Sequence, residues 1–216
     1  MTDSKLSSFQ SEILEAIFRH TSRFFLTGEA ALAGYHLGHR TTEDLDLFTH
    51  DEVIEEGEQA LASACSDVGA TIENIRTAPD FRRRLIARGT ETVIVDLVLD
   101  RNTASSEKLA FGNVRVDPCE EIMAHKLCTV LSRSEPRDLV DVMALDKAGI
   151  KVEDAISMAM TKDTGLTPAQ LAWVLSQVSI PDDASLLGQV DAREMRDFLT
   201  ELQGRLSRLA YPTETS

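Results

Sequence analysis

The sequence has 216 residues, of which 43% are hydrophobic and 27% are charged, and these values are typical of a folded globular protein rather than a disordered one. Its formal net charge of −14 argues against the broad basic face with which proteins bind extended duplex DNA. The chain shows no signal peptide, no apolar run near the roughly 20 residues of a membrane span, and no CxxC pair among Cys65, Cys119 and Cys128. We therefore expect a cytoplasmic protein with free thiols and no membrane partner.

The first half of the chain mixes helical and strand patterns. In the strand expected after residue 43, side chains alternate between two faces, so Asp44 and Asp46 share one face and Leu45 and Leu47 the other. The patterns predict helices over residues 5–20, 29–37 and 53–68, and strands over 24–26, 44–48, 71–77, 81–88, 92–99 and, more weakly, 108–116.

From Asp117 onward, nearly the whole sequence has helical periodicity. Asp117 suits a helix N-cap, Pro118 the first helical position, and Glu120 the third position of a capping box. The patterns predict helices over residues 118–132, 137–148, 152–161, 168–178 and 191–209. We therefore expect an α+β protein with a mixed-sheet α/β domain over residues 1–116 and a helical domain over residues 117–216.

Gly28 lies between an expected strand and an expected helix. Glycine allows the backbone to turn sharply, and the free amide groups at the start of a helix attract anions. This arrangement would suit the triphosphate of a nucleotide. A simple tight turn is the alternative explanation.

Asp96 is the one carboxylate in the apolar strand expected over residues 92–99. A buried carboxylate without a partner costs several kcal/mol. A cation shared with Asp44 and Asp46 would remove that cost, since Mg²⁺ (or Mn²⁺) prefers oxygen ligands and takes some of them from substrate phosphates. Two such ions can support an in-line phosphoryl transfer. The alternative is an ion pair with one of the arginines at residues 82–84 on a neighbouring strand.

Other polar residues allow two interpretations each. Lys126 lies on an amphipathic helix, where a lysine is usually solvated. Arg82 and Arg84 share a face of their strand, and they either hold phosphate or an RNA end in a cleft or balance acidic neighbours. His36 and His39 could join a metal site, although a packed residue and a turn residue explain them more simply.

Two blocks of the sequence resemble the AbiEii/AbiGii family of nucleotidyltransferase toxins. The first block is LTGEAAL at residues 26–32, followed by HRTTEDLDLF at residues 39–48. The second is EIMAHKL at residues 121–127, followed by Arg133 and by RDLVD at residues 137–141. The resemblance covers about residues 20–150. It implies a DNA-polymerase-β-like nucleotidyltransferase fold with a mixed sheet, followed by a helical domain.

The resemblance also implies an activity and its residues. A nucleoside monophosphate would pass from an NTP to an acceptor such as the 3′ end of a tRNA, and a separately encoded antitoxin would restrain the protein. The implied catalytic residues are Asp44, Asp46, Asp96 and Lys126, of which the three aspartates would also bind the metal. The implied nucleotide-binding residues are Gly28, Glu29, Arg40, Thr42, Lys126 and Asp138, the last being the acid of the helical domain.

Glu29 departs from the family pattern, in which a glycine or serine follows the first glycine. A carboxylate beside a triphosphate repels it by about 1 kcal/mol through water at 4 Å. One alternative is therefore a non-catalytic nucleotide-binding or interaction protein on the same fold. Another is a small-molecule nucleotidyltransferase for a cationic, antibiotic-type acceptor, which an acidic protein would attract.

Overall fold

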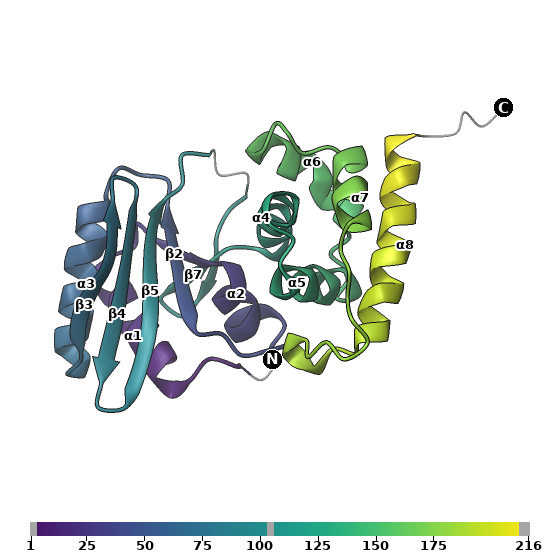
Figure 1. Ribbon diagram of the computed structural model, residues 1–216. Coiled ribbons are helices and arrows are strands. Elements are labelled where there is room, and N and C mark those ends of the chain that lie inside the picture. The colour runs from purple at the N-terminus through teal and green to yellow at the C-terminus, as the bar shows by residue number, and fades with distance from the viewer. Residues whose placement is uncertain (1–3, 103–105, 212–216) are drawn as a thin grey trace. The chain divides into compact units, whose positions relative to one another are not determined.

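The structure is a computed structural model that describes residues 4–102 and 106–211. The chain divides into two compact units, Met1–Pro118 and Cys119–Ser216. Figure 1 shows a sheet with flanking helices in the first unit and helices in the second, so the expected α+β class is confirmed. None of the helices within the described ranges has the length and apolar character that crossing a bilayer would require.

The first unit contains a mixed sheet of seven strands in the order β3-β4-β5-β2-β1-β7-β6. The pairs β1–β7 and β2–β5 are parallel, and the other neighbours are antiparallel. Its elements are α1 (Ser8–His20), β1 (Phe25–Thr27), α2 (Gly28–Ala31), the π-helix η1 (Leu32–His36), β2 (Asp44–Thr49), α3 (Ile54–Val68), β3 (Thr71–Ala78), β4 (Phe81–Arg88), β5 (Glu91–Leu99), β6 (Leu109–Phe111) and β7 (Val114–Val116).

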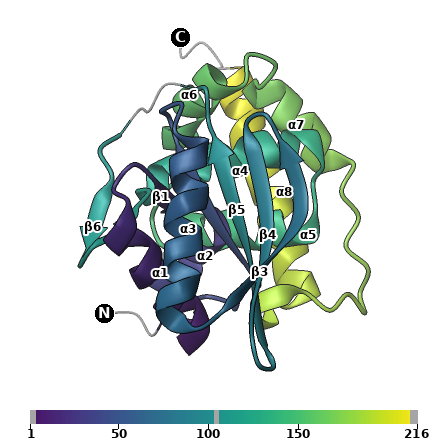
Figure 2. The same ribbon diagram turned by 90° about the vertical axis from the view of Figure 1, so that its left-hand side faces the viewer.

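Helices α1 and α3 lie side by side over one face of this sheet (Figure 2). A capping box formed by Ser7 and Gln10 starts α1, and Gly69 ends α3 in the left-handed conformation. Burial alternates along β2, where Leu45 and Leu47 are buried and the intervening aspartates are partly exposed. The apolar face of the central strands therefore packs against the helices, and the polar side chains lie on the opposite face.

Two expectations for the first unit are wrong in detail. The single weak strand expected over residues 108–116 is a hairpin of β6 and β7, because the chain reverses at Gly112, whose φ is +63°. The helix expected over residues 29–37 begins at Gly28 as α2 and continues as η1, with Gly38 following at a φ of +58°. Short π-helical segments of this type are frequent at functional sites.

The second unit is helical, as expected. Helix α4 packs against its three successors α5, α6 and α7, and α7 packs against α8. Thr167 and Asp191 cap α7 and α8 with their side chains. Its elements are α4 (Cys119–Ser132), α5 (Pro136–Lys147), α6 (Val152–Lys162), α7 (Pro168–Ser176), the 3₁₀ helix η2 (Leu187–Gln189) and α8 (Ala192–Ala210).

The capping box expected around Asp117 is wrong. Helix α4 begins at Cys119, and Oδ1 of Asp117 accepts a hydrogen bond of 2.6 Å from Lys108 Nζ. Asp117 is fully buried. Because a buried charge without a partner costs more free energy than a missing helix cap, the carboxylate pairs with the lysine.

Candidate active site

Three carboxylates share one face of the two central strands. In the parallel pairing of β2 with β5, Asp46 lies directly beside Asp96, and Asp44 lies two residues earlier on the same face of β2. Neighbouring strands are about 4.8 Å apart, so these side chains stand within one small acidic patch. The structure therefore brings Asp44, Asp46 and Asp96 together, while their roles stay predictions.

Gly28 borders this patch at the end of β1. Its neighbour Thr27 pairs with Asp46 across the antiparallel strands. A Cβ atom built on Gly28 would lie 2.6 Å from Oδ2 of Asp46, and the residue has a φ of +63°. Both observations favour glycine here, because a side chain would displace the Asp46 carboxylate and strain the backbone.

Arg83 of β4 borders the acidic patch and pairs with two of its carboxylates. It lies opposite Asp96 in the antiparallel pairing of β4 with β5, which places both side chains on the same face. Its Nη2 atom donates a hydrogen bond of 2.8 Å to Oδ2 of Asp44, and its Nε lies 3.5 Å from Oδ1 of Asp96. The ion pair considered as an alternative for Asp96 is therefore present, and its cation is Arg83.

Arg82 and Arg84 lie on the opposite face of β4. Both are buried, and both form ion pairs with Glu58 of α3, while Arg82 also binds Glu55. Of the two expectations for this pair, the balance of acidic neighbours is the one observed. These arginines attach α3 to the sheet and do not face the three aspartates.

Asp96 is the most enclosed member of the patch, with 7% of the residue exposed. Its pKa is raised to about 6, mainly by burial; the positive charge of Arg83 opposes this shift and the negative charge of Asp44 adds to it. Among the residues that the structure describes, none forms a hydrogen bond with its Oδ1 atom, which has only the ion pair with Arg83. The unbonded oxygen is therefore the part of the patch best suited to another cation.

The residue types of this patch suit a divalent cation, whereas their present arrangement does not. Three carboxylates on one face are the donor set that Mg²⁺ and Mn²⁺ prefer, and Asp96 has an oxygen without a hydrogen bond. However, nowhere in residues 4–102 and 106–211 are three or more His, Cys, Asp or Glu side chains already arranged to hold a metal ion. The donor chemistry fits, and the side chains as they stand are arranged around Arg83.

The charge of Glu29 is balanced within the first unit. Arg40 is buried, and its Nη1 donates a hydrogen bond to Oε1 of Glu29. The hydroxyl of Thr42 donates to the backbone carbonyl of Asp44 at 3.2 Å. Nε2 of His36 donates a hydrogen bond of 2.7 Å to the backbone carbonyl of Asp117. Arg40 and Thr42 therefore support the approach to β2, and the carboxylate of Glu29 is held by a cation.

Lys126 forms a buried ionic cluster in the second unit. Its Nζ atom lies 3.0 Å from Oδ1 of Asp138 and 2.6 Å from Oδ2 of Asp141. The expectation of a solvated lysine is wrong, because α5 covers this face of α4 with both aspartates. Asp141 belongs to the RDLVD string but received no role from the sequence. Its spacing of three residues from Asp138 indicates a shared helix face.

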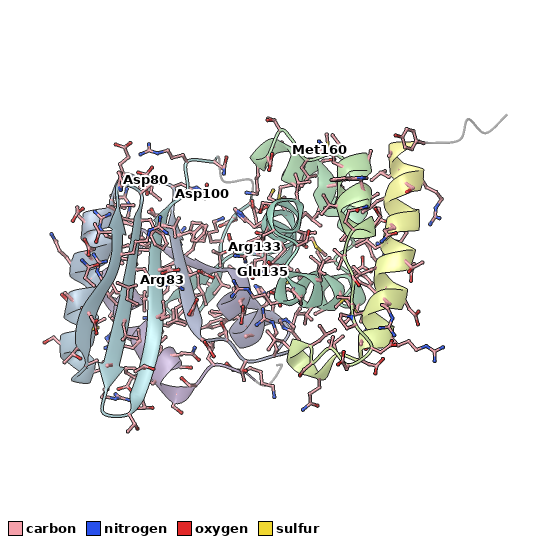
Figure 3. The ribbon with its side chains drawn as sticks, in the orientation of Figure 1. Asp80, Arg83, Asp100, Arg133, Glu135 and Met160 are labelled. Atoms are coloured by element: carbon pink, nitrogen blue, oxygen red, sulfur yellow. The ribbon has the colours of Figure 1, made fainter. Side chains whose placement is uncertain are left out.

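The charges of this cluster stabilise one another. Burial alone would lower the pKa of Lys126, but the Asp141 and Asp138 carboxylates reverse this and hold the pKa above its ordinary value. Arg133, labelled in Figure 3, donates from Nε to Oδ2 of Asp138 at 3.0 Å. Asp138 has no exposed surface and thus acts as a counter-ion of two cations rather than as a group open to a phosphate.

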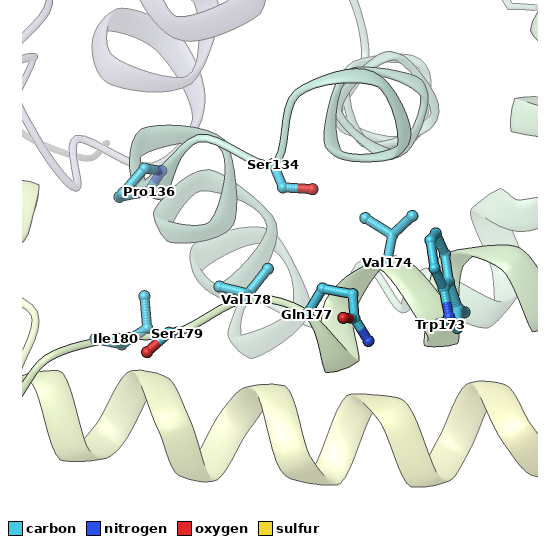
Figure 4. Close-up of a pocket in the computed structure, with 8 residues that line it drawn as sticks. All are labelled: Ser134, Pro136, Trp173, Val174, Gln177, Val178, Ser179 and Ile180. Atoms are coloured by element: carbon cyan, nitrogen blue, oxygen red, sulfur yellow. The ribbon is translucent and has the colours of Figure 1, made fainter.

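A separate cavity of about 410 Å³ lies elsewhere in the second unit (Figure 4). Its walls come from the start of α5, from α7 and from the segment that follows α7. Trp173, with 66% of its surface exposed, stands at one side of the opening. None of the site residues expected from the sequence lines this cavity.

Comparison with known proteins agrees with this architecture. The family model described as "Nucleotidyl transferase AbiEii toxin, Type IV TA system" matches residues 12–208. JHP933 from Helicobacter pylori is 22% identical with a TM-score of 0.59, and the match covers 95% of this chain and 97% of that one. MenT4, a nucleotidyltransferase toxin from Mycobacterium tuberculosis, is 18% identical with a TM-score of 0.64, covering 95% and 83% of the two chains. No curated protein sequence matches the chain.

Proposed function

The chain belongs to the AbiEii family of nucleotidyl transferase toxins, and from this premise we propose that it transfers a nucleoside monophosphate from an NTP to an acceptor hydroxyl. One observation carries the proposal. Asp46 and Asp96 are direct neighbours on β2 and β5, and Gly28 leaves the space that the Asp46 carboxylate needs. Carboxylates placed in this way are suited to bind a divalent cation that accompanies a nucleotide triphosphate.

The residues of the first unit would act on the cation and the acceptor. Asp44, Asp46 and Asp96 would hold Mg²⁺ or Mn²⁺ through their carboxylate oxygens. When bound, such a cation neutralises charge on the triphosphate and on the leaving pyrophosphate. Oδ1 of Asp96, which has no hydrogen bond among the described residues, would accept the proton of the acceptor hydroxyl or bind a second ion.

Lys126 would bind a phosphate oxygen. An ammonium group has three N–H donors, and the contacts with Asp138 and Asp141 account for two of them. The same two carboxylates keep the lysine protonated, so its third N–H would be the donor to the phosphate. Asp138 and Asp141 would thus position Lys126 without touching the nucleotide.

The acceptor and the partners are also part of the proposal. The family description refers to a toxin–antitoxin system, which supports an antitoxin encoded separately from this chain. We infer a tRNA end as the acceptor and the cytoplasm as the site of action, because both NTPs and tRNA are found there. The net charge of −14 favours an acceptor bound through its end rather than along an extended duplex.

Labelled NTPs test the reaction. The purified chain is incubated with each α-labelled NTP, Mg²⁺ and total tRNA, and transfer of label to RNA is measured. Asp46→Asn should lower the rate about 10³-fold, since losing a metal ligand removes several kcal/mol of transition-state stabilisation. Asp80→Asn is the control, because Asp80 is an exposed aspartate paired with Arg101. Equal labelling by wild type and Asp46→Asn would contradict the proposal.

Two alternatives can be separated in the same experiment. An aminoglycoside replaces tRNA as acceptor to test for a small-molecule transferase. This alternative is considered because an acidic protein attracts cationic acceptors. Calorimetric binding of NTP without labelling of any acceptor would identify a non-catalytic nucleotide-binding protein. The repulsion by Glu29 that motivated this last alternative is reduced by its pairing with Arg40.

A further inference from the structure

Arg83 differs from its neighbours on β4 in its freedom to move. Its side chain is 33% exposed, whereas the side chains of Arg82 and Arg84 are 8% and 9% exposed and are held by glutamates of α3. Among the described residues, the side chain of Arg83 forms ion pairs with Asp44 and Asp96 through its guanidinium end. A rotation of its side chain would release both carboxylates without disturbing the attachment of α3.

Arg83 and a divalent cation would compete for the carboxylate oxygens of Asp44 and Asp96. Nη2 of Arg83 lies 2.8 Å from Oδ2 of Asp44, and an Mg²⁺ ligand oxygen would have to lie about 2.1 Å from the ion. Two positive groups on the same oxygens would also repel each other at short range. Binding of the cation is therefore favoured when the guanidinium leaves.

The displaced guanidinium stays close to the site, because Arg83 is anchored at the position of β4 that pairs with Asp96. An NTP would bring phosphate oxygens to the cation, and a planar guanidinium matches two such oxygens with parallel N–H donors. The triphosphate thus offers Arg83 a replacement for the carboxylates that it has lost.

We propose that Arg83 is a displaceable counter-ion of the cation site. It holds Asp44 and Asp96 in the nucleotide-free protein, competes with a free divalent cation, and moves to a phosphate oxygen when cation and NTP bind together. The inference rests on the proposed function, since it needs a cation site at these aspartates. Its consequence is that the free protein binds cations weakly and that nucleotide and cation bind cooperatively.

Binding of Mn²⁺ alone tests the competition. Free aqueous Mn²⁺ is measured by electron paramagnetic resonance in titrations of wild type, Arg83→Gln and Arg101→Gln, without nucleotide. Arg83→Gln should bind Mn²⁺ about tenfold more tightly, the factor expected when one partly buried ion pair no longer competes. Arg101→Gln removes the same charge from an exposed residue that pairs with Asp80 and should leave the dissociation constant unchanged.

Arg83→Gln should have the opposite effect on the affinity for nucleotide. A non-hydrolysable NTP is titrated calorimetrically into the same three proteins at saturating Mn²⁺. Arg83→Gln should bind it about tenfold more weakly, because a charge-assisted contact with phosphate is lost. A misfolded variant would lose affinity for both ligands. Tighter binding of Mn²⁺ together with weaker binding of NTP therefore separates the proposed role from a structural one.

The outcomes distinguish the inference from the function on which it rests. One outcome is that wild type binds Mn²⁺, the double variant Asp44→Asn/Asp46→Asn does not, and Arg83→Gln binds it no more tightly than wild type. The counter-ion role is then overturned and the cation site stands. If the double variant binds Mn²⁺ as wild type does, the cation site itself is lost. Tighter Mn²⁺ with unchanged NTP affinity overturns the phosphate contact alone.

Discussion

Individual residues around the acidic patch are constrained by their immediate contacts. Gly28 has a positive φ and lies against the carboxylate of Asp46, so two independent requirements act on one position. Glu29 follows it and is paired with the buried Arg40. An anionic side chain beside a nucleotide site is thus compatible with the site when a cation of the same unit balances its charge.

Gly28→Ala should disturb both stability and cation binding. The left-handed backbone costs an alanine about 1–2 kcal/mol, and the added Cβ would push Asp46 from its position. We expect a lower free energy of unfolding in urea and weaker Mn²⁺ binding than in wild type.

Gly69→Ala is the matched control for this substitution. Gly69 has a φ of +68°, and no heavy atom of the described chain lies within 4 Å of a Cβ built there, apart from its own chain neighbours. The control should show the cost of the backbone alone and keep normal Mn²⁺ binding. Equal Mn²⁺ affinity in both variants would show that Asp46 tolerates the added Cβ.

At the level of elements, ionic clusters join the helices of the second unit. Arg205 of α8 contacts Asp146 at the end of α5 and Glu153 at the start of α6. Although burial raises the pKa of Asp146, hydrogen bonds from Arg205 and Lys151 bring it below its ordinary value of 3.8. The hydrogen bond from Arg205 is the main cause that lowers the pKa of Glu153 below 4.5. One arginine thus links three helices.

Arg205→Met should lower the free energy of unfolding by about 2 kcal/mol at pH 7, since it removes the cation that pairs with Glu153 and leaves Asp146 with Lys151. The pKa of each carboxyl is lower in the folded than in the unfolded state. The contribution of this cluster is therefore complete above pH 4.5 and decreases as the pH falls through the folded-state values.

Urea unfolding from pH 7 to pH 3 measures this dependence. The difference between wild type and Arg205→Met should shrink toward pH 3. Arg193→Met on the same helix is the control, because Arg193 and its partner Asp197 are both exposed. A difference that stays constant over this pH range would show that the loss comes from packing of the arginine stem rather than from its charge.

For the whole molecule, the charge balance limits how an RNA acceptor can bind. With a net charge of −14, the proposed reaction would depend on local cations such as Lys126 and Arg83 to bind phosphate. Affinity for RNA normally grows with the number of phosphates that lysine and arginine neutralise. A protein of this charge should therefore contact few phosphates of its acceptor.

The salt dependence of tRNA binding tests this expectation. Fluorescence anisotropy of labelled tRNA is measured between 50 and 200 mM KCl, and the logarithm of the association constant is plotted against the logarithm of salt concentration. The slope should be no steeper than about −3, which corresponds to a few phosphate contacts. A slope near that of broad basic binders would contradict recognition through the tRNA end.

The local periodicity of the sequence was sufficient to predict most of the helices and strands. Alternation in β2, the apolar run of β5 and helical spacing in α3 and α8 are properties of short segments, so these elements were predictable. The motif blocks also led to the family that the comparison confirms. The reversal at Gly112 was missed although Gly-Asn between two apolar runs is a hairpin signal, because each run has only three residues.

Tertiary structure decided which partners the charged side chains have. The alternation of residues 82–84 was readable, but the pairing register of β4 with β5 directs Arg83 toward Asp96 and its two neighbours toward α3. In the same way, the packing of α5 on α4 buries Lys126 beside Asp138 and Asp141. Pairing register and helix packing join segments distant along the chain, and burial of a charge depends on those contacts rather than on its neighbours in the sequence.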